Sequence, residues 1–85
     1  MFLAFQFAKK IPMPKQVAIF ADRYREKFDQ EPTTALIHPA TFDAAVSKGE
    51  VAAPSPGNPP EVGGLLVNAV AFMPQGCIYL GEYGG

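Results

Sequence analysis

The chain has very little of the chemistry from which most catalytic and metal sites are built. Its 85 residues include one cysteine, one histidine and no tryptophan. A single cysteine excludes an internal disulfide, so nothing marks an oxidising compartment and we expect a cytoplasmic location. One histidine and one cysteine are too few to close a metal site, and the carboxylates are scattered without ligand spacing. We therefore expect neither a metal nor a cofactor.

Strong charge of one sign and long apolar runs are also lacking. The formal net charge is -1, which argues against the broad basic surface that a general nucleic-acid binder needs to neutralise phosphates. The apolar segment at residues 1–8 is far too short to cross a bilayer, and no basic segment precedes it. We expect no nucleic acid and no membrane among the partners.

What the chain does have is apolar material. Apolar residues make up 48% of it and seven residues are phenylalanine, which is more than a disordered chain carries. A chain of 85 residues forms one domain, here residues 1–85, and buries a smaller fraction of its surface than a typical domain does. The core is therefore thin, and association with another copy would help to stabilise it.

Apolar periodicity predicts the first two elements. Leu3, Phe5 and Phe7 alternate with a mixed set of neighbours, as in a strand with one core face. From Pro14 to about Gln30, apolar residues recur every three or four positions, which predicts an amphipathic helix that is stopped by Pro32. The apolar stripe of this helix consists of Val17, Phe20, Ala21, Tyr24 and Phe28.

The rest of the chain predicts one more helix and three more strands. Residues 34–38 are typical of a strand that leads, at His38-Pro39, into a short helix closed near Gly49. Residues 50–63 lose all periodicity and contain a proline-rich run at 54–60, which predicts a loop. Residues 64–72 and 77–80 are typical of strands, and the turn residues between them favour a closing antiparallel hairpin.

The order strand, helix, strand, helix, strand, strand predicts an α+β fold with two layers. We expect a sheet of about four strands with one long and one short helix mainly on one face. The first three elements allow the first two strands to pair in parallel through a right-handed crossover. The order of the strands within the sheet stays open at this point.

His38, Thr41 and Cys77 are the candidate ligand-binding residues. His38 precedes a helix N-terminus, which opposes positive charge and so favours a neutral imidazole that can accept a proton. Cys77 begins the last predicted strand and would imitate a thiol–imidazole pair if its strand lay beside that of His38. The alternatives are a capping or packing role for His38 and a simply packed thiol for Cys77. No recognised catalytic spacing surrounds these residues, so we assign no catalytic residue.

Phe2, Phe5 and Phe7 are the candidate interface residues. Their strand is apolar, and at a sheet edge it would pair with its counterpart in another copy. The run at 54–60 contains the spacing of a polyproline docking peptide but also suits a plain connecting loop. Residues 9–27 hold six basic and two acidic side chains, whereas residues 28–85 hold one basic and six acidic ones. This polarity would orient two copies or an acidic partner, or simply marks a solvated helix face.

Three segments together resemble the peripheral-domain region of tailed-phage major capsid proteins. They are residues 36–42 (Leu-Ile-His-Pro-Ala-Thr-Phe), 64–67 (Gly-Leu-Leu-Val) and 73–82 (Met-Pro-Gln-Gly-Cys-Ile-Tyr-Leu-Gly-Glu). Those proteins run from a long helix into a strand ending in Asn-Pro, then a short helix, a loop and a hairpin. The resemblance implies an assembly module of similar topology over about residues 14–82. His38 stands where asparagine is usual, and the length excludes a complete capsid protein.

Three functional hypotheses follow. The first is a non-enzymatic small domain that acts through protein–protein contacts, either by self-association or with another protein. The second is a small-ligand-binding or catalytic domain whose pocket gathers His38, Thr41 and Cys77. The third is an accessory or assembly module with phage-capsid-like topology.

Overall fold

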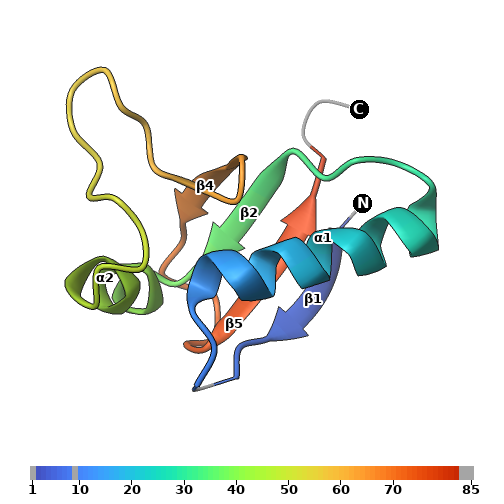
Figure 1. Cartoon of the computed structure of the whole chain (residues 1–85), viewed down its shortest axis with the longest axis horizontal. Coiled ribbons are helices and arrows are strands. Elements are labelled where there is room, and N and C mark those ends of the chain that lie inside the picture. The colour runs from blue at the N-terminus through green and yellow to red at the C-terminus, as the bar shows by residue number, and fades with distance from the viewer. Residues whose placement is uncertain (1, 9, 83–85) are drawn as a thin grey trace.

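A computed structural model describes residues 2–8 and 10–82 of the chain, and it confirms the α+β fold. Two helices and five strands lie within these residues, and Figure 1 shows the longer helix crossing in front of the sheet. The elements in chain order are β1 (Phe2–Gln6), α1 (Met13–Phe28), β2 (Thr34–Ile37), α2 (Pro39–Ser47), β3 (Glu61–Val62), β4 (Leu65–Ala69) and β5 (Cys77–Gly81).

The strands form one mixed sheet in the order β1-β5-β2-β4-β3. β5 runs antiparallel to both β1 and β2, so β1 and β2 point the same way but are separated by β5. The direct parallel pairing that the first three elements allow does not form. β2 instead pairs in parallel with β4, and the short β3 closes the other edge in an antiparallel pair with β4.

The predicted hairpin of the last two strands is wrong, because β2 lies between β4 and β5. The backbone N–H of Val70 still bonds the carbonyl of Ile37 (2.9 Å), so the chain follows β2 to its end before it turns back. β5 then enters the middle of the sheet, where Ile78 and Leu80 are completely buried. If β5 formed a hairpin with β4, it could not lie between β1 and β2. The apolar surface that β5 buries at this central position therefore outweighs the preference of residues 73–76 for a tight turn.

Helix α1 begins and ends where local chemistry requires. Pro14 falls in its first turn, where a missing N–H costs no intrahelical bond, and basic Arg25 and Lys27 lie in its last turn. The helix ends at Phe28, two residues before the predicted end. Asp29 adopts a left-handed conformation (φ 55°) there and donates its N–H to the carbonyl of Arg25 (2.8 Å).

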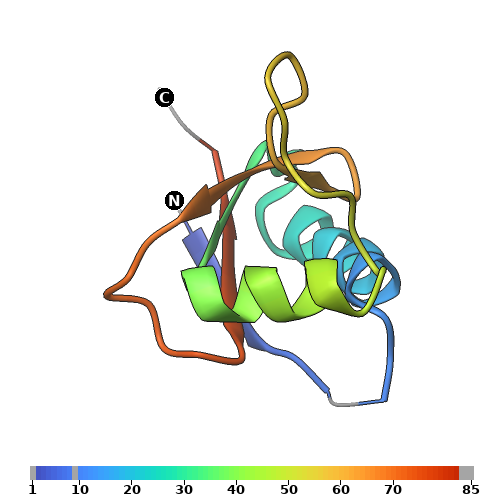
Figure 2. The same ribbon diagram turned by 90° about the vertical axis from the view of Figure 1, so that its left-hand side faces the viewer.

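The core lies between the sheet and both helices, on one face of the sheet. Alternate strand residues point into it, and Figure 2 shows both helices on this side. Its buried members are Met13, Val17, Ala21 and Tyr24 from α1, Phe42 and Ala45 from α2, and Ala35, Ile37, Val62, Leu65, Val67, Ile78 and Leu80 from the strands. Phe20 and Phe28, expected within the apolar stripe of α1, pack against this cluster but are only partly buried.

The proline-rich region is a loop with little regular structure, as predicted, although it ends in one element that was missed. An isolated antiparallel bridge joins Ser55 and Asn58, and Glu61–Val62 form the two-residue strand β3. Two residues are too few for alternation to stand out in the sequence. This explains why five strands form where about four were expected.

Candidate functional site

The face of the sheet that points away from the helices is largely apolar. Strand residues alternate between the two faces, so the register of the pairs fixes which side chains lie on it. We call this surface the open sheet face. Its apolar members are Phe2 and Ala4 of β1, Cys77 and Tyr79 of β5, Leu36 of β2 and Leu66 of β4, and the polar residues Gln6, Thr34 and Asn68 lie among them. Phe2 is 39% exposed and Leu66 49% exposed.

The ring of Phe2 lies over a glycine on the open sheet face. Phe2 pairs with Gly81 of β5, and a Cβ at Gly81 would come within 2.1 Å of the Phe2 ring. Only glycine leaves room for the ring in this position. Phe72, in the loop after β4, is 83% exposed, and Figure 2 shows the backbone of this loop on the side away from the helices.

The open sheet face carries little charge. Among the strand residues whose side chains lie on it, Glu61 at the β3 edge is the one with a formal charge. The ion pairs of the described residues join Arg25 to Asp22 and to Glu31, and Arg25 belongs to α1 on the opposite layer. The surface thus has the apolar, weakly charged composition of an interface core.

The three predicted interface phenylalanines do not share one surface. The rings of Phe5 and Phe20 stack with centroids 4.4 Å apart and an angle of 8° between their planes. Phe7 also contacts Phe20, at 5.9 Å between centroids. Phe5 and Phe7 therefore bind β1 to α1 inside the molecule, and Phe2 alone lies on the open sheet face.

Of the three predicted ligand residues, His38 has a structural role. It is the N-cap of α2, and its Nδ1 accepts a hydrogen bond from the backbone N–H of Ala40 (3.0 Å). Because Ile37 pairs with Ile78, the backbone of His38 lies opposite Cys77. Cys77 itself is half-buried on the open sheet face, whereas His38 is directed toward its own helix.

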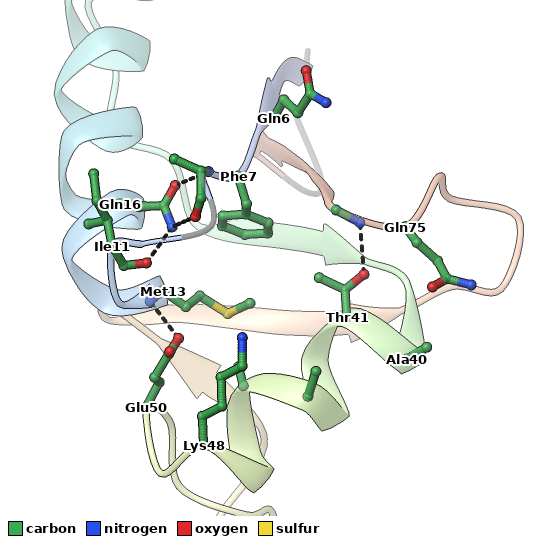
Figure 3. Close-up of a pocket in the computed structure, with 14 residues that line it drawn as sticks. Gln6, Phe7, Ile11, Met13, Gln16, Ala40, Thr41, Lys48, Glu50 and Gln75 are labelled. Carbon is green, nitrogen blue, oxygen red and sulfur yellow. Dashed lines mark hydrogen bonds between the residues drawn. The ribbon is translucent and has the colours of Figure 1, made fainter.

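Thr41 lies at a separate place, a cavity of about 370 Å³ that is open to solvent. The cavity is lined by the end of β1, the start of α1 and one side of α2, and neither His38 nor Cys77 contributes to it. The Thr41 hydroxyl accepts a hydrogen bond from the backbone N–H of Gly76 (2.9 Å), as Figure 3 shows. The predicted pocket of three residues is thus divided between two surfaces.

Two other polar side chains of the cavity, those of Gln16 and Glu50, form hydrogen bonds with backbone groups of the protein. The amide of Gln16 accepts from the N–H of Ala8 (2.6 Å) and donates to the carbonyls of Ala8 (3.0 Å) and Ile11 (2.6 Å). Glu50 accepts from the backbone N–H of Met13 (2.9 Å). Lys48 points its charge into the space next to Met13 (Figure 3), and the Glu50 carboxylate lines the same cavity, so the cavity holds one charge of each sign beside an apolar wall.

Within residues 2–8 and 10–82, no group of three or more histidine, cysteine, aspartate or glutamate side chains has the arrangement of a metal site. Neither described helix combines the length and the apolar character needed to span a bilayer. Comparison with protein-family models, curated proteins and solved structures gave no match. The resemblance to phage capsid proteins therefore stays a prediction.

Proposed function

We propose that this chain is a non-enzymatic domain that acts through protein–protein contacts, and that its first contact is with a second copy of itself through the open sheet face. The observation that carries the proposal is that a five-stranded sheet has both helices on one face, with Phe2, Leu36, Leu66 and Tyr79 on the other. Two-layer folds normally bury each apolar sheet face, and two such faces pack at about 10 Å.

Charge favours a second copy as the occupant. When two copies meet through their open sheet faces, the charged side chains of α1 lie on the outer layers, away from the contact. The like charges of the two helices then do not oppose association. A two-fold axis through the contact also lets the same apolar patch of each copy cover that of the other.

The ligand-binding alternative has weaker support. A thiol–imidazole pair requires His38 and Cys77 to face one pocket, but His38 caps α2 and neither residue lines the cavity. We therefore favour association over catalysis, and we assign no catalytic residue.

The experiment compares two lysine substitutions at apolar residues of similar exposure. Leu66 (49% exposed) lies on the open sheet face, and Ile19 (44% exposed) lies on α1. Light scattering over about a hundredfold range of concentration should give a dimer mass for the unchanged chain and for Ile19→Lys. Leu66→Lys should give the monomer mass, because it places a charge in the contact. A monomer at all concentrations for the unchanged chain, or a dimer that Leu66→Lys leaves intact, would refute the proposal.

A further inference from the structure

The outer edge of β1 offers a second, independent surface. β1 is the terminal strand of the sheet, with only β5 beside it. The N–H of Phe7 bonds the carbonyl of Gly76 on the β5 side (2.8 Å). Because backbone groups alternate in direction along an antiparallel pair, the N–H and C=O groups of Leu3 and Phe5 point toward β5 as well, and those of Ala4 and Gln6 point outward.

The backbone N–H and C=O groups of Ala8, the next residue that points outward, show what the outer edge of β1 can bind. Ala8 follows in the same alternation, and the Gln16 side chain both accepts from its N–H (2.6 Å) and donates to its C=O (3.0 Å). This two-point pairing is what a neighbouring strand would supply. Gln16 is 5% exposed and also donates to the carbonyl of Ile11. Its side chain therefore covers the backbone edge of the sheet at Ala8, whereas Ala4 and Gln6, earlier along the same edge, are exposed.

This edge lacks the features that normally prevent pairing. Residues 2–6 contain no proline, no lysine and no other charged side chain. Natural edge strands usually carry such residues, or a bulge, to block an added strand. The backbone of β1 is therefore suited to accept an extended segment.

Charge on the adjacent helix indicates the kind of segment. Gln16, Phe20, Arg23 and Lys27 follow one another at steps of four, three and four residues, so they form one stripe along α1. Gln16 contacts Ala8 and Phe20 contacts Phe5 and Phe7, which places this stripe on the β1 side. Arg23 and Lys27 are exposed, and the ion pairs of α1 within the described residues involve Arg25 instead.

From these observations we propose that the outer edge of β1 binds an extended segment of another protein that carries acidic side chains at alternate positions. The segment extends the sheet by backbone hydrogen bonds to Ala4 and Gln6, and its carboxylates on the helix side pair with Arg23 and Lys27. A second copy is a poorer occupant of this edge. Antiparallel pairing of two β1 strands would bring the two basic stripes together on the same side of the extended sheet.

The test uses a blocked hexapeptide in which valine and glutamate alternate, with the valine–lysine peptide as its charge-reversed counterpart. Calorimetric titration should show binding of the glutamate peptide only. Amide hydrogen exchange at Ala4 and Gln6 should slow on its addition. Lys27→Glu should weaken binding about fivefold, whereas Lys15→Glu, off the stripe, should change it less than about twofold.

Ala4→Pro removes an outward N–H while keeping the pairing with β5, and edge strands tolerate such a proline. It should abolish binding of the glutamate peptide. Equal binding of both peptides, equal effects of Lys27→Glu and Lys15→Glu, or protection of Ala4 and Gln6 in the concentrated protein without peptide would overturn the proposal. Titrating Leu66→Lys in parallel separates this edge from the open sheet face, because its binding of the peptide should match that of the unchanged chain.

Discussion

At the scale of single residues, Gln16 is the side chain that fixes the connection between β1 and α1. It is nearly fully buried and makes three hydrogen bonds to backbone groups of Ala8 and Ile11. Replacement by alanine leaves these groups without their partner in a partly buried place, which is more costly than the loss of an exposed bond. Gln16 thus belongs to the core although its side chain is polar.

We predict that Gln16→Ala lowers the free energy of unfolding by about 2 kcal/mol. Urea denaturation followed by far-UV circular dichroism measures the change. Gln75→Ala is the matched control, because Gln75 also lines the cavity but is exposed, and it should cost less than about 0.5 kcal/mol. Equal costs for the two glutamines would contradict the role assigned to Gln16.

The sequence predicted residue roles where they depend on near neighbours. The His38-Pro39 pair marks a helix start, and the structure confirms a capping role for His38, one of the two alternatives considered. The sequence could not predict that the Thr41 hydroxyl would bond the loop before β5, or that the Gln16 side chain would bond the backbone of Ala8. A glutamine beside the apolar stripe of a helix occupies the same position in the sequence pattern whether its amide is solvated or bonded to the backbone of a turn. The pattern therefore could not distinguish the two cases for Gln16.

At the scale of elements, α2 depends on its N-cap more than α1 does. It has nine residues, and the Nδ1 of His38 accepts from the second residue of the helix. We predict that His38→Ala lowers the free energy of unfolding by about 1 kcal/mol, and that His38→Asn restores most of it because asparagine also caps well. Thermal denaturation of the three proteins checks this. A variant with asparagine as unstable as that with alanine would argue against capping.

Helix α1 buries the ring of Tyr24 completely. Burial raises the pKa of this phenol above its ordinary value of 10.0, and the nearby Glu82 carboxylate raises it further. Above pH 10 the unfolded chain therefore loses the phenolic proton before the folded protein does. Stability is highest below that pH and falls as the pH rises, by at most about 1.4 kcal/mol for each pH unit.

This pH dependence can be assigned by comparison with Tyr24→Phe. Urea denaturation between pH 8 and 11 should show a smaller alkaline loss of stability for the variant, because the lysines titrate alike in both proteins. Parallel pH profiles would mean that Tyr24 ionises equally in the folded and unfolded states. Such a result would place the phenol in solvent, against the burial described.

Element types followed from periodicity, but strand neighbours did not. Alternation predicts the strand at residues 2–6, and the short apolar runs at 34–37 and 77–81 also favour strands. Alternation contains no information on which strand lies beside which, and the short connection before β5 favoured a hairpin that does not form. The choice depends on how much apolar surface the whole sheet buries, which no single segment specifies.

At the scale of the whole molecule, the thin core and the open sheet face have one cause. The described residues form two helices, and both pack against the same side of the five-stranded sheet. Leu36, Leu66 and Tyr79 are apolar at positions where a sheet with one solvated face usually carries polar residues. These apolar residues could have indicated the open sheet face from the sequence. Which of them share a face, however, depends on the register of the strand pairs, which the sequence does not specify.

Cys77 provides the most direct test of the claim that a second copy covers the open sheet face, since it is the only cysteine in the chain and lies on that face. The measurement is the initial rate at which a thiol reagent modifies Cys77 as the protein concentration is raised. The account predicts that the rate for the unchanged chain falls as the dimer forms, while Leu66→Lys keeps the rate of the dilute protein. A rate for the unchanged chain that does not vary with protein concentration would contradict it.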